Sequence, residues 1–164
     1  MTTYVIPYRS VGKTRLGDRE LAQAMMSDVV AACHAADPDD VIIVGAPGGQ
    51  GEALHGALFT RRGPVTIVNS DVPCATADEL KRLSAAAPAL VPAADGTTNA
   101  IALRDAQDFV PLYGPGSAAR YREAFDANPL DLPGLRDDVD TWDDLDRVRT
   151  RVGPNTRRYL QGRS

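Results

Sequence analysis

Three short motifs in the second half of the chain carry groups that bind a phosphate and a hard metal cation. They are Asp95-Gly96-Thr97-Thr98-Asn99-Ala100, Gly114-Pro115-Gly116-Ser117 and Asp138-Val139-Asp140-Thr141. The first two offer backbone N–H groups and hydroxyls, which can hold a phosphate or a carboxylate. The third offers a pair of carboxylates, and oxygen atoms are the ligands that Mg²⁺ takes in proteins. Together the motifs indicate a phosphate bridged to a metal ion.

The carboxylate pair Asp138 and Asp140 has two interpretations. In an extended segment both side chains lie on one face, where they repel each other unless a cation or a proton lies between them. The alternative is an acidic helix start, because Asp137, Asp143 and Asp144 crowd the same region and acidic side chains complement the helix dipole. The first interpretation predicts a metal site, and the second predicts none.

Candidate residues for a nucleotide site lie earlier in the chain. Asp71 follows an apolar run, where it can ligate a cation or simply form a turn. Lys13 and Arg15 can hold nucleotide phosphates, or they belong to a solvated basic loop. The glycine spacing of a P-loop is absent around them, so the motif alone does not decide between the two.

Glycines and hydroxyls also have a structural alternative. Three glycines lie close together, at Gly48, Gly49 and Gly51. They can let the backbone approach a nucleotide, or they can form a flexible turn. Thr98, Gly114 and Ser117 can donate to a phosphate or carboxylate, but turns and caps use the same residue types, and Ser117 is expected to cap a helix.

The elements that must position these residues follow from the apolar pattern. Strands are predicted at residues 4–7, 41–44, 65–68, 90–91 and 100–103. Helices between them predict an α/β fold with a mostly parallel sheet, whose loops 10–15, 45–51 and 69–73 gather at one edge. The 41–44 run has no polar alternation, so we expect it to be covered on both faces. One domain, 1–164, is expected, with a loosely held polar tail after about residue 153.

Composition limits the partners. The net charge of −4 gives no indication of a nucleic-acid partner, and no apolar run is long enough to span a membrane. Cys33 and Cys74 lie far apart without metal-ligand spacing, which favours a reducing, cytoplasmic location. The sequence leaves the oligomeric state open.

In this order along the chain, the motifs resemble the 2-phospho-L-lactate guanylyltransferase family, also described as phosphoenolpyruvate guanylyltransferase, of coenzyme F420 biosynthesis. The matching segments are Ile6-Pro7, Lys13-Thr14-Arg15-Leu16, Ser70-Asp71-Val72-Pro73, Gly96-Thr97-Thr98-Asn99-Ala100, Gly114-Pro115-Gly116-Ser117, Pro133-Gly134-Leu135 and Asp138-Val139-Asp140-Thr141. They cover nearly the whole chain. The three C-terminal motifs are specific as a set, whereas nucleotidyltransferases of the same fold share the N-terminal ones more widely.

The resemblance implies a three-layer α/β/α nucleotidyltransferase fold of the glycosyltransferase-A-like kind. It implies an enzyme that transfers GMP from GTP to phosphoenolpyruvate or 2-phospho-L-lactate and releases pyrophosphate. The implied Mg²⁺ ligands are Asp71, Asp138 and Asp140. The implied ligands of the phospho-acid are Thr98, Gly114 and Ser117. The implied nucleotide contacts are Lys13, Arg15, Gly48, Gly49, Gly51 and Asp71.

The chain departs from the family's pattern in three places. Members are usually longer, and the segment between Val44 and Gly48 is short, as though a strand and a helix had been lost. Gly51-Glu52 stands where the family typically has Leu-Asn, and the Gly96-Thr97-Thr98-Asn99 motif is one glycine short. Two alternatives therefore stand beside the first hypothesis. One is an enzyme of this fold with another nucleotide or acceptor, and the other is a non-catalytic paralogue that binds a phosphometabolite or a protein.

Overall fold

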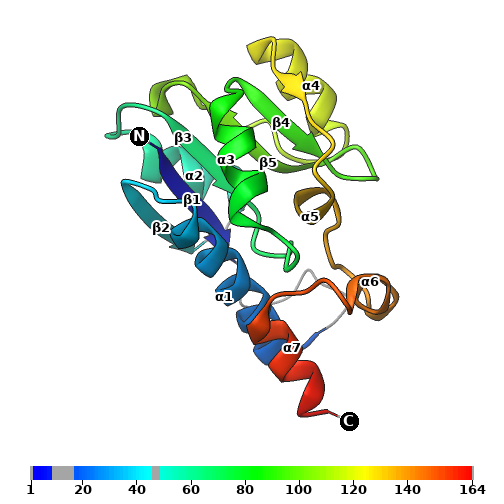
Figure 1. Ribbon diagram of the computed structural model, residues 1–164. Helices are drawn as coiled ribbons and strands as arrows, with labels where there is room; N and C mark the ends of the chain where they lie inside the picture. The colour runs from blue at the N-terminus through cyan, green and yellow to red at the C-terminus, as the bar shows by residue number, and fades with distance from the viewer. Residues whose placement is uncertain (1, 9–16, 46–48, 164) are drawn as a thin grey trace.

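A computed structural model describes residues 2–8, 17–45 and 49–163. At its centre is a six-stranded sheet with the strand order β2-β1-β3-β5-β4-β6 (Figure 1). The strands are β1 (Thr3–Tyr8), β2 (Asp40–Gly45), β3 (Val65–Val68), β4 (Ala89–Pro92), β5 (Thr98–Leu103) and β6 (Asn128–Pro129). β5 runs antiparallel to its neighbours β3 and β4, and the other pairs are parallel. The prediction of a mostly parallel sheet is therefore confirmed.

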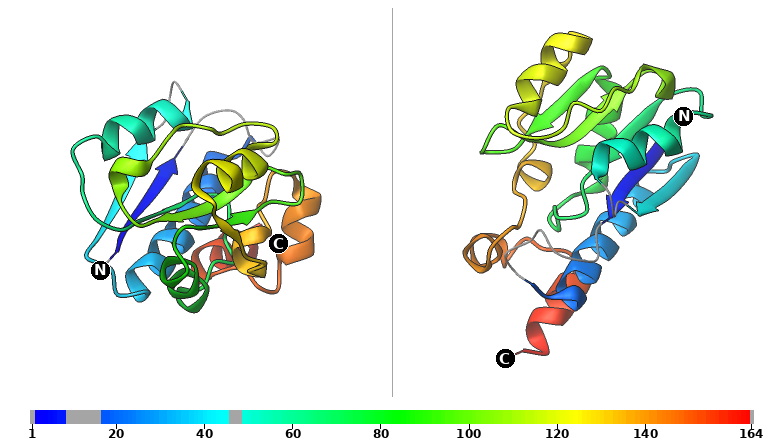
Figure 2. Two further views of the ribbon diagram at one scale, coloured as in Figure 1. Left: turned by 90° about the horizontal axis from the view of Figure 1, so that it is seen from above. Right: turned by 180° about the vertical axis from the view of Figure 1, so that it is seen from behind.

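Helices cover both faces of the sheet, which gives the predicted three layers. The helices are α1 (Arg19–Ala35), α2 (Gln50–Leu58), α3 (Ala77–Ala85), α4 (Ser117–Phe125), α5 (Pro133–Arg136), α6 (Trp142–Val148) and α7 (Pro154–Gln161), with a 3₁₀ turn η1 (Ala106–Asp108). α1, α3 and α5 lie on one face of the sheet, and α2 and α4 lie on the other (Figure 2). Side chains of the first three share one hydrophobic core, and those of α2 and α4 share a second. Across the described ranges, every helix is too short or too polar to cross a lipid bilayer.

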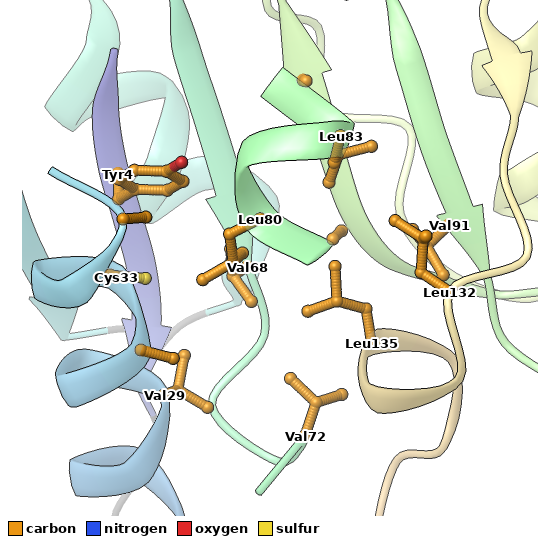
Figure 3. Packing of buried hydrophobic residues seen from close by; sticks show 14 of the residues in the cluster. Tyr4, Val29, Cys33, Val68, Val72, Leu80, Leu83, Val91, Leu132 and Leu135 are labelled. Atoms are coloured by element: carbon orange, nitrogen blue, oxygen red, sulfur yellow. The ribbon is translucent and has the colours of Figure 1, made fainter. Parts of the chain in front are cut away.

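The core shared by α1, α3 and α5 fixes the start of the acidic C-terminal segment. Figure 3 shows Val68 of β3, Leu80 and Leu83 of α3, and Leu135 of α5 directed into the same interior. All four side chains are fully buried, and burial of each contributes about 1.5–3 kcal/mol. Because α5 ends only two residues before Asp138, this packing also sets where the carboxylate pair begins.

Local capping explains where the site-bearing helices start. Asp18 caps α1 by accepting from the N–H of Leu21 at 3.0 Å. Thr141 and Asp144 form a capping box at the start of α6. The prediction that Ser117 caps α4 is wrong. Gly116 is the cap residue, with a φ of +75° that favours glycine, so α4 starts at Ser117 and leaves its hydroxyl for another partner.

The prediction that residues 41–44 are covered on both faces is also wrong. β2 lies at the edge of the sheet, and each of its residues is exposed or half-buried. Ile43 is 48% exposed. A run of β-branched residues reports strand propensity, but it carries no information on how many neighbouring strands the fold supplies.

The tail after residue 153 is an ordered helix, contrary to the expectation that it is loosely held. Asp28 of α1 is almost fully buried and accepts from the backbone N–H groups of Asn155 and Thr156, both at 2.9 Å. Gly153 lies directly against Asp28, where a Cβ would come within 2.9 Å of Asp28 Cβ. This carboxylate caps α7 and docks it along α1 (Figure 1).

Candidate active site

The acidic motif lies against the turn that follows β3. The N–H of Val139 donates to the carbonyl oxygen of Asp71 at 2.9 Å. The side chain of Val139 is fully buried, whereas Asp138 and Asp140 on either side of it are half-buried. The backbone alternates here as it does in an extended segment, so the interpretation of Asp138 and Asp140 as a pair on one face fits the structure.

Asp71 is the most perturbed carboxyl group at this edge. Its Oδ1 atom is buried and has no hydrogen-bond partner among the described residues. Burial, followed by the charges of Asp138 and Asp140, raises the pKa of Asp71 to about 7. The charges of Asp138 and Asp140 thus reach Asp71, so the three carboxylates proposed as one site lie in the same part of the structure.

Asn99 of β5 orients the second of these carboxylates. Its side-chain amide donates to the carbonyl oxygen of Arg136 at 2.8 Å and to Asp138 Oδ1 at 3.2 Å. Burial raises the pKa of Asp138, and the hydrogen bond from Asn99 opposes that rise. Asn99 is itself almost fully buried, so it holds Asp138 from a fixed position. The sequence analysis placed Asn99 in a motif that can donate to a phosphate or a carboxylate, and it did not foresee the contact with Asp138.

A buried carboxylate oxygen without a partner fits a cation, because no other described group neutralises it. The present side-chain positions do not form a complete ligand set. In the described residues, no group of three or more His, Cys, Asp or Glu side chains is arranged to hold a metal ion. The ligand roles of Asp71, Asp138 and Asp140 therefore remain predictions.

The three residues predicted to bind a phospho-acid also meet in space. The hydroxyls of Thr98 and Ser117 lie 3.0 Å apart and are buried. Gly114 accepts from the N–H of Ser117 at 3.0 Å, and Gly96 accepts from the N–H of Ala118 at 3.1 Å. The two hydroxyls bond to each other in this structure and join β5 to α4. Their predicted contact with a ligand is not tested.

A cleft of about 520 Å³ opens beside the acidic segment. Its charged lining residues are Asp95, Arg136, Asp137, Asp138, Asp140, Asp144, Arg147 and Arg151. Partial burial raises the pKa of Asp137, but ion pairs with Arg136 at 2.9 Å and Arg151 at 2.6 Å lower it overall. The sequence analysis missed these arginines. The only signal was a set of basic residues scattered through an acidic segment.

Asn69 connects the two sides of the candidate site. Its Nδ2 donates to the carbonyl oxygen of Thr98 at 3.1 Å, and its Oδ1 accepts from Gln50 Nε2 at 2.6 Å. Gln50 begins α2, next to Gly49 and Gly51, and Thr98 begins β5. The side-chain amide of Asn69 therefore links the start of α2 to the start of β5. The sequence analysis assigned Asn69 no role, although its place directly after β3 was a signal.

The predicted nucleotide side is described only in part. Lys13, Arg15 and Gly48 lie outside the described residues. Gly49 is the residue before α2, with a φ of +137°, and Gly51 lies in the first turn of that helix. A Cβ on Gly51 would lie 2.8 Å from Pro111 Cβ, so close packing already requires a glycine there. A nucleotide contact by Gly49 or Gly51 is a prediction that the structure leaves untested.

Solved structures with this fold include several transferases. A protein described as a nucleotide-diphospho-sugar transferase from Desulfovibrio desulfuricans matches with a TM-score of 0.63 at 18% identity, over 95% of this chain and 90% of that chain. A nucleotidyl transferase from Methanothermobacter matches with a TM-score of 0.58 at 15% identity, over 92% of this chain and 96% of that chain. Rv0371C of Mycobacterium tuberculosis, solved with manganese, matches with a TM-score of 0.54 at 19% identity, over 92% of this chain and 98% of that chain. At these identities the likeness establishes the fold alone.

The fold is the one that nucleotidyl and nucleotide-diphospho-sugar transferases share. Curated relatives narrow the class. The 2-phospho-L-lactate guanylyltransferase of Methanoregula boonei is 32% identical over 96% of this chain and 86% of its own length. The phosphoenolpyruvate guanylyltransferase of Streptomyces coelicolor is 30% identical over 94% of this chain and 93% of its own length. The chain belongs to this guanylyltransferase family. No protein-family model matches the chain.

Proposed function

We propose that this protein transfers GMP from GTP to a phosphorylated three-carbon acid, phosphoenolpyruvate or 2-phospho-L-lactate, in coenzyme F420 biosynthesis. The names of the relatives support the nucleotide and the acceptor class. The observation that carries the proposal is the unpartnered Asp71 Oδ1 beside Asp138 and Asp140, at the strand ends of a nucleotidyltransferase fold.

In the proposed reaction, an oxygen of the acceptor's phosphate forms a bond to the α-phosphorus of GTP. The bond from the α-phosphorus to the bridging oxygen breaks, and pyrophosphate leaves with that oxygen. No proton has to be removed from an ionised phosphate oxygen, so the chemistry needs no general base. The proposed reaction therefore does not require a catalytic histidine.

Both substrates are anions, so the site must offset their repulsion. Asp71, Asp138 and Asp140 would hold Mg²⁺, which would neutralise the phosphates and align them. Asn99 keeps Asp138 turned toward this position from β5. The manganese in the structural neighbour from Mycobacterium tuberculosis is compatible with a divalent cation at this edge.

The remaining assignments divide the site into two sides. Thr98, Gly114 and Ser117 would hold the phospho-acid, after the Thr98–Ser117 hydrogen bond opens to accept it. Lys13, Arg15 and the glycines Gly48, Gly49 and Gly51 would contact GTP. Asn69 lies between the acceptor side and the nucleotide side, and its two hydrogen bonds would fix their relative position.

A nucleotide-by-acceptor activity matrix tests the proposal. Purified protein is incubated with each of the four ribonucleoside triphosphates, Mg²⁺ and each of several phospho-acids, and released pyrophosphate is measured. We expect release with GTP and a three-carbon phospho-acid, and loss of it in Asp140→Asn. Release with another nucleotide or acceptor would favour a related transferase. No release in any combination would favour the non-catalytic paralogue and overturn the proposal.

A further inference from the structure

We propose that Gln50 determines which nucleobase the protein accepts, with its side-chain Oε1 atom taking hydrogen bonds from the N1–H and the N2 amino group of guanine. The inference rests on the proposed function, because it names a specificity-determining contact on the nucleotide side of the same site. It concerns only the base, so it can fail while the proposed reaction stands.

Gln50 is the one residue with a side chain in the stretch Gly48-Gly49-Gln50-Gly51. It begins α2, in the connection that follows β2, and it is half-buried. Ligands of α/β sheets bind beyond the carboxyl ends of the strands, and glycines let the backbone approach a ligand closely. A ligand against this stretch therefore has one side-chain amide to bond with, that of Gln50.

A series of hydrogen bonds fixes the orientation of the Gln50 amide. The carbonyl oxygen of Thr98 can only accept, so Asn69 turns its Nδ2 atom toward it, at 3.1 Å. Asn69 Oδ1 then faces Gln50 and accepts from Gln50 Nε2 at 2.6 Å. The amide nitrogen of Gln50 is therefore engaged with Asn69, and its Oε1 atom lies on the other side of the amide group.

The second contact of Gln50 leaves that oxygen available to a ligand. A hydrogen bond joins the Gln50 side chain to Tyr113, whose ring packs edge-on against Tyr121 with the ring centroids 5.3 Å apart. An amide oxygen has two lone pairs, so Oε1 keeps at least one of them. Asn69 and Tyr113 thus hold the amide and leave it one acceptor to offer.

An acceptor needs a donor as its partner, which excludes phosphate oxygens and favours guanine over adenine. Guanine presents two adjacent donors, N1–H and the N2 amino group, and one oxygen can accept from both. Adenine presents the lone pair of N1 in the same place, which would repel Oε1. A site that hydrogen-bonds a substrate group rejects an analogue without that group, because the site's own polar group is left unpaired.

Hydrogen bonds also connect Gln50 to the proposed metal site. Asn69 directly follows β3 and lies two residues before Asp71, and its N–H donates to the carbonyl oxygen of Asn99 at 2.9 Å. Asn99 in turn donates to Asp138. Gln50 therefore belongs to the same connected set of residues as the proposed cation ligands, as a contact to the base of the same nucleotide requires.

Nucleotide selectivity tests the role of the Gln50 oxygen. The measurement is kcat/KM for pyrophosphate release with GTP, ITP and ATP, because inosine keeps N1–H and loses only the amino group. Wild type should prefer both GTP and ITP to ATP. Gln50→Met removes the acceptor at nearly constant size, so it should lower the GTP-to-ATP ratio about ten-fold, the effect of one hydrogen bond. Gln50→Glu loses the donor to Asn69 but keeps an acceptor, so it should be less stable and still prefer GTP.

The matched control is Gln107→Met. The Gln107 amide donates to carbonyl oxygens at the end of α2, those of Leu58 and Phe59. Its loss loosens the same helix without removing an acceptor from the glycine-rich stretch, so the GTP-to-ATP ratio should stay unchanged. An unchanged ratio in Gln50→Met, or a preference lost equally in Gln50→Met and Gln50→Glu, would show that Gln50 only positions Asn69 and would overturn the inference.

Calorimetric titration with nucleotide and Mg²⁺, without an acceptor, separates this inference from the proposed function. Selective binding of GTP that Gln50→Met loses would support the base contact, with or without pyrophosphate release. Pyrophosphate release from GTP with an unchanged ratio in Gln50→Met would support the reaction and remove the base contact. A wild-type protein that binds GTP and ATP equally, or binds neither, overturns the inference.

Discussion

The side chain of Asn99 donates to Asp138 Oδ1 at 3.2 Å and ties the acidic segment to the adjacent strand β5. The same amide donates to the carbonyl oxygen of Arg136 at 2.8 Å. A single residue thus fixes both the path of the backbone before the carboxylate pair and the orientation of its first member. The precision of the proposed cation site depends on this contact, because the acidic segment has no regular secondary structure.

We expect Asn99→Asp to remove most pyrophosphate release and Asn99→Ala to lower kcat about ten-fold. The aspartate replaces a donor with a charge that repels Asp138, whereas the alanine leaves Asp138 free to rotate. Loss of the bond to Arg136 also costs about 1–3 kcal/mol of folding stability. The measurement is kcat at saturating Mg²⁺, together with thermal unfolding.

The matched control for Asn99 is Gln107→Ala. The Gln107 amide also donates to backbone carbonyls, at Phe59 and Leu58, but outside the cleft. It should lower stability and leave kcat unchanged. An equal loss of kcat in both variants would mean that Asn99 acts through stability alone.

The parts of the site that sequence could predict are those that local pattern determines. Asp71 follows a strand, and the spacing of Asp138 and Asp140 around a buried Val139 indicates a pair on one face. Contacts between distant segments could not be predicted in this way. The carboxylate that fixes α7 comes from Asp28, 127 residues before Asn155, and no local pattern reveals such a cap. Likewise, β2 has a strand pattern whether or not a neighbouring strand covers it.

Replacing Asp71 should change how stability depends on pH in the absence of metal. The folded pKa of Asp71, about 7, lies above the ordinary carboxyl value of 3.8. The folded protein therefore binds the proton more tightly than the unfolded chain, and stability falls as pH rises between these two values. Asp71→Asn stays neutral, so its melting temperature should equal that of wild type near pH 4 and exceed it at pH 8.

Asp137→Asn should change the pH dependence of stability in the opposite direction to Asp71→Asn. Its ion pairs with Arg136 and Arg151 lower the pKa of Asp137, so the charged form stabilises the fold above the unfolded pKa and loses that effect in acid. This variant should be less stable than wild type at neutral pH, and the difference should shrink as pH falls. A constant difference for Asp71→Asn across the pH range would show that the carboxyl is not destabilised by burial.

Removing the buried hydroxyls of Thr98 and Ser117 should weaken binding of the phospho-acid acceptor and leave nucleotide binding unchanged. Ser117→Ala and Thr98→Val should each raise KM for the phospho-acid about three- to ten-fold, the effect of one hydrogen bond, with KM for GTP nearly unchanged. Because the two hydroxyls bond to each other, the double variant should lose less binding than the sum of the single losses.

Ser84→Ala is the matched control for the hydroxyl variants. Its hydroxyl bonds to Tyr4 and Thr66 in the core, at 3.1 and 2.8 Å, away from the acceptor loop. It should leave both KM values unchanged. A rise in KM for GTP in Ser117→Ala would place this pocket on the nucleotide side instead.

The attachment of the C-terminal helix should depend on Asp28. Its carboxylate accepts from the N–H of Asn155 and of Thr156 at 2.9 Å and from Asn155 Nδ2 at 3.0 Å. Asp28→Ala removes these bonds and leaves the N-terminal donors of α7 buried, so the free energy of unfolding should fall by about 3 kcal/mol. Asp39→Ala, at an exposed aspartate, should change it by less than about 0.5 kcal/mol. Urea denaturation measures both, and equal stability of Asp28→Ala and wild type would show that α7 is held by its apolar contacts with α1 alone.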